Sequence, residues 1–242
     1  MVKRDLPIPE KLSVIIPCYN EEKRIGMTLD RVHQYLRERI KDFEILVVND
    51  GSRDKTMHVV SQLAAKLDRI RLLNNPGNQG KGFSVRNGMV NAAGDYRLFS
   101  DADLSTPIEE LEVLSLYIKE YPVVIGSRRV PGSHIEIHQP IYREWMGQVF
   151  NLFFQSIVIR GIIDSQCGFK LFTKKAAIDI FSRMTINGFG FDAEALFLAR
   201  KLGYPVKEAP VKWLDDPQTK VHPLRDATTM FFDLFRVRIR HF

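Results

Sequence analysis

The sequence predicts an α/β fold built on a mostly parallel, doubly wound sheet. Apolar runs with the length and composition of buried strands occur at four places: Leu12–Pro17, Phe43–Val48, Tyr96–Ser100 and Val123–Ile125. Helical patterns occupy residues 22–39, 54–67 and 83–92. Apolar strands that alternate with helices are typical of parallel pairing, with helices covering both faces of the sheet.

The first two helical segments are amphipathic. Apolar residues three or four positions apart form one face of each, with charged residues opposite: Ile25, Leu29, Val32 and Leu36 in the first, and Val59, Leu63 and Leu67 in the second. This spacing places the apolar residues on the side of each helix that packs against the sheet.

The four strands deliver polar groups at the same end. Asn20 and Glu21 follow the first strand, Asp50 the second, Asp101 the third and Arg128 the fourth. Ligands of open α/β sheets bind outside the carboxyl ends of the strands. We therefore expect these four tips to meet at one crevice.

Composition favours one catalytic domain in a reducing compartment. The chain has 242 residues, of which 45% are hydrophobic, enough for one large core or one core with an accessory segment. Cys18 and Cys167 lie far apart without metal-ligand spacing, so neither a disulfide framework nor a zinc site is expected. The first residues lack the apolar core of a secretion signal, so we do not expect export by that route.

A net charge of +6 predicts attraction to an anionic partner. The sign of the charge does not choose among nucleic acid, acidic lipid and phosphorylated substrates. In the second half of the chain, however, basic residues are mixed with bulky apolar ones. This mixture favours a membrane surface, and nucleic acid is not expected as a partner.

Two segments carry the mixed pattern. Trp145–Ile159 has apolar side chains at helical spacing (Met146, Phe150, Phe153, Ile157), but polar residues interrupt it, so it should lie in the membrane interface and not cross the bilayer. Residues 230–235, followed by three arginines, repeat the theme. For both, a helix that packs on the protein core is the open alternative. We divide the chain into a catalytic domain at 1–225, with an interface helix at about 141–163, and a basic amphipathic tail at 226–242.

Asp101 and Asp103 directly follow the strand Tyr96–Ser100. Two carboxylates at the carboxyl end of a buried strand can hold a hard divalent cation, which in turn can bind a diphosphate. A surface turn or a helix cap is the other explanation for such a pair. The arrangement suggests a nucleoside diphosphate as leaving group.

Seven motifs follow one another between about Leu12 and about Val221: Ser13–Glu22, Val48–Asp54, Asn78–Gly82, Asp101–Asp103, Gly126–Arg128, Asp164–Lys170 and Gly188–Glu194. In this order they resemble glycosyltransferase family 2, whose members have the GT-A fold. The first four motifs are specific to the nucleotide-sugar fold. The last three narrow the resemblance to the branch that uses polyprenyl phosphates as acceptors.

The resemblance implies which residues bind the donor. Those expected to contact the donor nucleotide are Pro17, Tyr19, Asn20, Glu21, Asp50, Gly80, Lys81, Asp101, Ala102 and Lys220. Asp101 and Asp103 are expected to ligate Mg²⁺ or Mn²⁺, with Asp103 coordinating it directly. Ser105 stands where some relatives carry a longer amide ligand. Lys220 aligns with a mobile segment that closes over the diphosphate.

Several of these residues also have structural explanations. Asn20 could cap a helix, and Asp50 could form a turn. The turn at residues 80–82 offers backbone donors and one cation to an anion, or it could be purely structural. It is not a Walker A loop, because Gly82 stands where that loop has Ser or Thr. Lys220 could be a solvated loop lysine.

The same resemblance implies transfer of a hexose to a lipid phosphate. A phosphate monoester is largely dianionic at neutral pH, since its second pKa is about 6, so it needs arginines more than a base. Arg128 and Arg129 are expected to bind it. The expected catalytic residues are Asp103, Arg128, Asp164 and Asp192. Asp164, Asp192 and Glu194 are the candidate bases if the acceptor is a hydroxyl.

We therefore expect a metal-dependent inverting transferase that is peripheral to the cytosolic face of a membrane. Glucose from UDP-glucose, passed to dolichyl or another polyprenyl phosphate in β linkage, is the first hypothesis. Mannose from GDP-mannose is the second, and a sugar-hydroxyl acceptor is the third. A nucleotidyltransferase fits the motifs less well. A nucleic-acid or membrane-binding module without turnover is the alternative from a different class.

Overall fold

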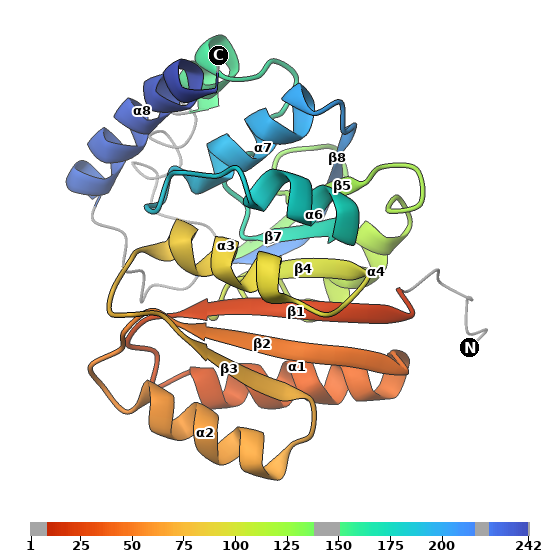
Figure 1. Cartoon of the computed structure of the whole chain (residues 1–242). Coiled ribbons are helices and arrows are strands. Elements are labelled where there is room, and N and C mark those ends of the chain that lie inside the picture. Colours follow the sequence, from red (N-terminus) through yellow and green to blue (C-terminus); the bar gives the residue numbers. More distant parts are fainter. Residues whose placement is uncertain (1–8, 138–150, 216–222, 242) are drawn as a thin grey trace.

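The computed structural model in Figure 1 describes residues 9–137, 151–215 and 223–241. Within these ranges, a seven-stranded sheet lies between two layers of helices. A two-stranded parallel sheet, β6 (His134–Ile137) with β9 (Lys212–Leu214), is attached to it. The predicted α/β class with a mostly parallel sheet is confirmed.

The large sheet has the strand order β3-β2-β1-β4-β7-β5-β8. The strands are β1 (Lys11–Cys18), β2 (Asp42–Asn49), β3 (Ile70–Asn74), β4 (Tyr96–Ser100), β5 (Val123–Ser127), β7 (Phe169–Thr173) and β8 (Val206–Pro210). Neighbouring strands are parallel except at β7, which runs antiparallel between β4 and β5. The carboxyl ends of β1, β2, β4 and β5 therefore share one edge of the sheet, as predicted.

The reversed strand β7 brings another segment to that edge. Ser100, the last residue of β4, pairs with Phe169, the first residue of β7. The loop at residues 164–168, which precedes β7, consequently lies next to the Asp101 turn. A parallel strand in this place would have put the same loop at the opposite edge.

Each face of the sheet has its own core. The helices α1 (Ile25–Arg39), α2 (Thr56–Lys66) and α4 (Leu111–Ser115), with the short 3-10 helix η1 (Ile108–Glu110), pack on one face, and α3 (Lys81–Asn91), α6 (Lys174–Phe181) and α7 (Phe191–Lys201) pack on the other. The predicted face of α1 is confirmed, because all four of its apolar residues are fully buried. The apolar face predicted for the second helix is partly buried on the same core.

The sequence patterns located the first helices and strands closely but missed others. The four predicted strands are present and are extended by up to two residues at an end. The predicted helix at residues 83–92 starts two residues earlier, at Lys81. In the large sheet, the strands β3, β7 and β8 were not predicted, because their apolar runs are short or interrupted by charges. Both cysteines are free and buried.

An arginine inside the sheet anchors α3. Arg97 of β4 is 1% exposed, and its guanidinium donates to the backbone carbonyls of Met89, Ala92 and Gly94 at the end of that helix. A cation at a helix C-terminus satisfies carbonyls that have no partner within the helix. Arg97 thereby attaches the end of α3 to β4, and the start of α3 lies at the candidate site.

The C-terminal helix α8 (Pro223–Arg240) docks on the core along one side (Figure 1). Leu234 and Val237 are fully buried, and a ring nitrogen of His241 lies 2.6 Å from the buried Glu194 carboxylate. Among the described residues, no helix combines the length and the hydropathy that a membrane span requires. The proposed tail at 226–242 thus packs on the protein along part of its surface.

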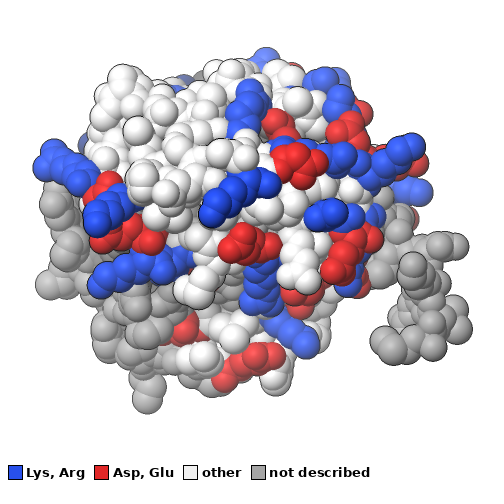
Figure 2. Space-filling model, turned by 90° about the horizontal axis from the view of Figure 1, so that it is seen from below, with Lys and Arg blue, Asp and Glu red and all other residues white. Residues whose placement is uncertain are grey.

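Charges of both signs alternate on the face that carries α1 and α2. Figure 2 shows this face from below, with lysine and arginine side chains interspersed with acidic ones. Two ion pairs there join α1 to the acidic residues around η1 and α4, Arg31 to Glu109 at 3.0 Å and Arg39 to Glu112 at 3.3 Å. The excess of positive charge does not gather on this face.

Candidate active site

The turn that begins directly after β4 is held from two sides. The Asp101 amide donates to the Gly168 carbonyl in the loop before β7 (3.1 Å). The hydroxyl of Thr28 in α1 donates to the Ala102 carbonyl (2.6 Å). Asp101 and Ala102, which are predicted to contact the donor nucleotide, therefore lie at the carboxyl edge of the sheet. Ala102 is buried there and Asp101 is partly exposed.

Asp103 lies beside Asp101 and is partly buried. Burial and the Asp101 carboxylate raise the pKa of Asp103 above its ordinary value, although the Ser105 amide donates to it at 2.9 Å. A neighbouring cation would lower this pKa again, since opposite charge favours the ionised carboxylate. Two ionised carboxylates this close repel each other, so Asp101 and Asp103 favour a positive charge beside them.

The two carboxylates fit part of a divalent cation site. Within the described ranges, no group of three or more His, Cys, Asp or Glu side chains could hold a metal ion. Carboxylate oxygens suit Mg²⁺ and Mn²⁺, and Mg²⁺ is commonly held by one or two carboxylates together with substrate phosphates. Asp101 and Asp103 would hold such an ion when a diphosphate completes its coordination.

Lys81, the first residue of α3, reaches the same carboxylate. Its Nζ lies 2.7 Å from Asp101 Oδ1 and 5.5 Å from the centre of the Phe99 ring. Burial lowers the pKa of Lys81, but the carboxylates of Asp101, Asp192 and Asp103 outweigh burial and raise it above the ordinary value. The side chain is therefore a charged ammonium at neutral pH.

The backbone donors of the turn at residues 80–82 are used inside the protein. The Gly80 amide donates to Asp50 Oδ2 at 2.8 Å, and the amides of Gly82 and Phe83 both donate to the Asn187 carbonyl, at 2.7 and 3.2 Å. The prediction that this turn offers backbone donors to an anion is wrong for the amides of Gly80 and Gly82. The side chain of Lys81 is the part of the turn that reaches the site.

Asp50 is buried at the end of β2 and ties the next loop to it. Its Oδ1 accepts from the Asn75 side chain at 2.8 Å and from the Gln79 amide at 3.0 Å, while Oδ2 accepts from Gly80. The carboxylate thus orders the approach to α3 through partners 25 to 30 residues away. Contact of Asp50 with a base or ribose stays a prediction.

The other predicted nucleotide residues lie at the end of β1. Pro17 is buried in the strand and Tyr19 is half-buried just beyond it. Asn20 has a φ of 53° and accepts from the Arg53 amide at 2.8 Å, so it joins the tips of β1 and β2 and does not cap α1, whose N-cap is Arg24. The adjoining Glu21 carboxylate pairs with Arg24.

At the end of β5, Arg128 forms a fork-to-fork pair with Asp164. Its Nε and Nη2 donate to the two carboxylate oxygens at 2.7 and 2.8 Å, and its amide donates to Oδ2 at 2.9 Å. Burial opposes ionisation of Asp164, but Arg128 outweighs it and lowers the pKa of Asp164 to about 2. The guanidinium lies 5.2 Å from the Trp213 ring centre, and Arg129 follows, half-buried.

The remaining predicted carboxylates are also engaged. Asp192 pairs with Lys170 of β7 at 2.5 Å, and both side chains are almost fully buried. Glu194 is fully buried and accepts from the Thr185 amide and hydroxyl and from the Ile186 amide at 2.8 to 3.0 Å. It holds the loop before α7 in place, and it also contacts His241 of the C-terminal segment.

Sequence reasoning missed several residues that shape the site. Lys170, Gly168 and Asn187 were parts of motifs or loops without an assigned role, and Glu208 of β8, which accepts from the amides at 163 and 164, was not considered. A lysine inside the apolar run at residues 169–173 was an available signal, because a buried lysine requires a partner of opposite charge. No local signal marked the other three.

Part of the predicted site lies outside the described residues. Lys220 and residues 141–150 of the proposed interface helix belong to the ranges that the structure does not describe. For residues 151–157, which are helical, Phe153 is 40% exposed and contacts Phe231 of α8 with a ring-centre distance of 5.0 Å.

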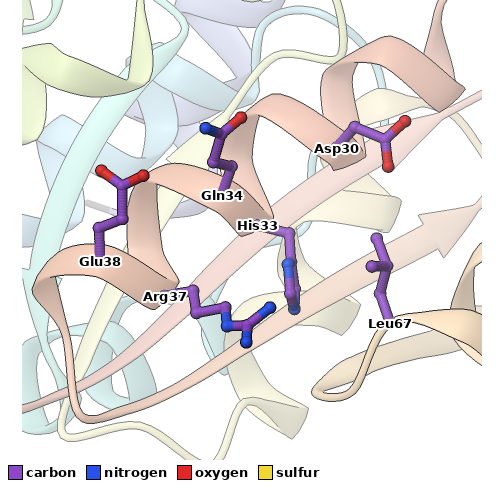
Figure 3. Close-up of a pocket in the computed structure, with 6 residues that line it drawn as sticks. All are labelled: Asp30, His33, Gln34, Arg37, Glu38 and Leu67. Carbon is purple, nitrogen blue, oxygen red and sulfur yellow. The ribbon is translucent and has the colours of Figure 1, made fainter.

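A hollow of about 500 Å³ borders α1 (Figure 3). Its lining comes from α1, from Asp30 onwards, and from the residue after α2: Asp30, His33, Gln34, Arg37, Glu38 and Leu67. In a parallel unit the helices run back from the carboxyl edge of the sheet, so these residues lie towards the opposite edge. The hollow is therefore separate from the Asp101 turn.

Solved structures share this arrangement of sheet and helices. Mannosyl-3-phosphoglycerate synthase from Rubrobacter xylanophilus superimposes with a TM-score of 0.68 at 21% identity, covering 96% of this chain and 73% of that one. Glucosyl-3-phosphoglycerate synthase from Mycobacterium tuberculosis, solved with Mn²⁺, UDP and phosphoglyceric acid, gives a TM-score of 0.68 at 16% identity, covering 95% and 78%. The fold is that of the GT-A glycosyltransferases.

Sequence similarity identifies the family of GT-A glycosyltransferases to which the chain belongs. The family model for glycosyl transferase family 2 matches residues 13–181. The dolichyl-phosphate beta-glucosyltransferases of Dictyostelium discoideum and Homo sapiens are 34% and 32% identical to this chain, over 95% and 96% of its length and 74% and 76% of theirs. The chain belongs to glycosyltransferase family 2, and the resemblance found in its motifs is confirmed.

Proposed function

We propose that this protein transfers glucose from UDP-glucose to dolichyl phosphate, or to a related polyprenyl phosphate, with inversion at the anomeric carbon. The relatives from Dictyostelium and human support the sugar and the acceptor, because they align with nearly the whole chain. A GT-A neighbour solved with Mn²⁺ and UDP-glucose supports the donor. A single displacement at C1 of an α-linked donor gives a β-linked product.

The ion pairs and hydrogen bonds of the candidate bases favour a phosphate acceptor over a sugar hydroxyl. Asp164 is bound to Arg128, Asp192 to Lys170, and Glu194 to backbone and side-chain donors. A sugar hydroxyl needs a carboxylate that is available to take its proton. A lipid phosphate is already largely dianionic near neutral pH, because its second pKa is about 6, and it needs no such base.

The donor side follows from the charges at the Asp101 turn. A divalent cation held by Asp101 and Asp103 would supply positive charge to the departing diphosphate. Lys81 places an ammonium at the same carboxylate and can donate to a phosphate oxygen as negative charge develops there. The further proposal that Lys220 closes over the diphosphate and excludes water rests on the family resemblance.

The acceptor side follows from the end of β5. The pair with Asp164 and the contact with Trp213 hold the Arg128 guanidinium in one orientation, and two of its five N–H donors are used by Asp164. We assign its remaining donors, together with Arg129, to the lipid phosphate. Asp164 then acts as a positioning residue for Arg128.

Sugar transfer from labelled donors tests the proposal. The purified protein is incubated with UDP-glucose or GDP-mannose, Mg²⁺ or Mn²⁺, and a short polyprenyl phosphate, and label in the organic phase is counted. We expect label in the organic phase from UDP-glucose and not from GDP-mannose, and we expect excess chelator to abolish it. The anomeric proton of the product should give the nuclear magnetic resonance signal of a β linkage. The unphosphorylated polyprenol is the matched control. Equal transfer to that alcohol, or label only from GDP-mannose, would contradict the proposal.

We also propose that an exposed apolar rim contacts the cytosolic surface of a membrane. The rim consists of five side chains on residues 151–157 and α8 that are exposed by 40% to 79%: Leu152, Phe153, Phe232, Phe235 and Ile239. Arg236, Arg238 and Arg240 are exposed on the same helix. Aromatic and aliphatic side chains flanked by arginines suit the boundary between acyl chains and anionic headgroups.

Vesicle flotation tests the rim. Phe232→Ser with Phe235→Ser should reduce the fraction bound to vesicles of phosphatidylcholine and phosphatidylserine at least threefold, and raised salt should reduce binding of the wild type. Met27→Ser is the control, because Met27 is 71% exposed on α1, away from the rim. Equal losses in both variants, or no loss in the rim variant, would contradict a membrane contact at this surface.

A further inference from the structure

Lys81 covers the oxygen of Asp101 that a divalent cation would use. Its Nζ lies 2.7 Å from Asp101 Oδ1, and the two side chains are 27% and 28% exposed. The other carboxylate oxygen packs against the backbone of Gly168, because a Cβ built there would lie 1.9 Å from Oδ2. The oxygen that is open to a ligand is therefore the one already paired with an ammonium.

The backbone on either side of Lys81 packs closely against the loop at residues 186–188. Gly80 has a φ of 100°, and a Cβ on Gly80 or Gly82 would lie 2.4 or 2.5 Å from the carbonyl oxygens of Asn187 or Ile186. The loop at 186–188 is in turn held by Glu194, which accepts from the Ile186 amide at 2.8 Å. The four-carbon side chain of Lys81, which is 27% exposed, extends from this closely packed backbone to Asp101.

The surrounding charges require a cation at this place. Asp101, Asp103 and Asp192 all act on the Lys81 ammonium. The neighbouring lysine, Lys170, is buried and bound to Asp192 and to a backbone carbonyl, so it is not available to the other two carboxylates. Among the described residues, the ion pair of Asp101 is with Lys81. Lys81 thus neutralises part of the acidic turn in the absence of a ligand.

We propose that Lys81 is a resident counter-cation, which a divalent cation must displace from Asp101 and which then pairs with the diphosphate that arrives with it. Two cations cannot share one carboxylate oxygen at contact distance without strong repulsion. An arriving diphosphate offers Lys81 a new anionic partner, and the diphosphate and the metal then strengthen each other's binding. The metal alone binds weakly, and the metal with the diphosphate binds well.

This inference rests on the proposed donor site, and its test measures binding without sugar or lipid. Mn²⁺ binding to the whole protein is followed by the electron paramagnetic resonance signal of the free ion, with and without UDP. We expect Lys81→Met to bind Mn²⁺ alone about fivefold more tightly than wild type, as for removal of a competing, partly exposed ion pair. At saturating Mn²⁺, UDP should bind to Lys81→Met at least tenfold more weakly than to wild type. Lys81→Arg should resemble wild type in both measurements.

Lys175→Met is the matched control. Lys175 is 81% exposed on α6 and pairs with Asp179 at 2.9 Å, so removing it deletes an ion pair of similar length far from the turn, and Mn²⁺ affinity should not change. Thermal unfolding of each variant verifies its fold. Mn²⁺ affinity that is unchanged or weaker in Lys81→Met would overturn the inference even if the wild type transfers glucose. Absence of glucose transfer by the wild type would instead contradict the proposed function. The Mn²⁺ affinities of wild type and Lys81→Met would still test whether Lys81 competes with the metal.

Discussion

Gly168→Ala tests whether the position of the Asp101 carboxylate controls activity. A Cβ on Gly168 would lie 1.9 Å from Asp101 Oδ2, whereas real Cβ atoms essentially never approach another heavy atom within 3.0 Å. The carboxylate must therefore move by about 1.1 Å. The loop can yield little, because its carbonyl accepts the Asp101 amide at 3.1 Å and β7 begins at the next residue.

We expect the loss to fall on activity more than on stability. Asp101 is partly exposed, so its side chain can rotate towards solvent, and the free energy of unfolding should fall by about 1 kcal/mol, the low end for overpacking. For a chain of this size that corresponds to a decrease in Tm of about 2–4 °C. A displacement of about 1 Å in a catalytic arrangement lowers rates about 100-fold, and we expect this decrease in kcat/KM.

The assay compares transfer rate and thermal unfolding with those of Gly26→Ala. A Cβ on Gly26, in α1, would meet only Val59 at an ordinary 3.5 Å. That variant should keep full activity and gain slightly in Tm, because alanine is favoured over glycine in helices. Activity of Gly168→Ala within threefold of wild type would refute the reasoning, as would equal losses in both variants.

Three further variants test separate parts of the site. Asp103→Ala should abolish transfer while the protein stays folded, and near-normal turnover would refute the cation assignment. Asp164→Asn should lower the free energy of unfolding by about 2 kcal/mol at pH 7, because the folded pKa of about 2 lies below the ordinary 3.8. A lowered pKa stabilises the fold above pH 4 and this effect is lost as the pH falls towards 2, so the difference from wild type in urea titrations should narrow there; a widening difference would contradict it. Glu194→Gln should lower Tm by several degrees and speed trypsin cleavage at the end of α8, since Glu194 joins His241 to the core; unchanged cleavage would show that α8 docks without it.

Local patterns predicted a large part of the fold and the centre of the site. The apolar runs before Asn20, Asp50, Asp101 and Arg128 correspond to strands whose ends share one edge of the sheet. Burial of a strand and the polarity of the residue after it are both local properties. The convergence of these tips follows from parallel pairing, which the alternation of strands and helices also predicts.

Roles that depend on distant partners were not predictable in this way. Asp192 reads as a base in the sequence, but Lys170, 22 residues earlier, pairs with it in the core. Asp50 reads as a turn former, yet its partners lie 25 to 30 residues further along the chain. The charge state and the availability of a carboxylate depend on what the fold brings within 3 Å, and no local pattern encodes this.

By itself, the sequence determined the α/β class, the acidic turn after the third predicted strand and the family to which the chain belongs, because these depend on short-range periodicity and on contiguous motifs. The tertiary structure alone decided that β7 runs in reverse and presses Gly168 against Asp101, and that Lys81 occupies the carboxylate a metal would need. It also decided that one side of α8 is buried and the other exposed. Each of these depends on contacts between segments that are remote in the chain, where packing and charge, and not local propensity, select the arrangement of lowest free energy.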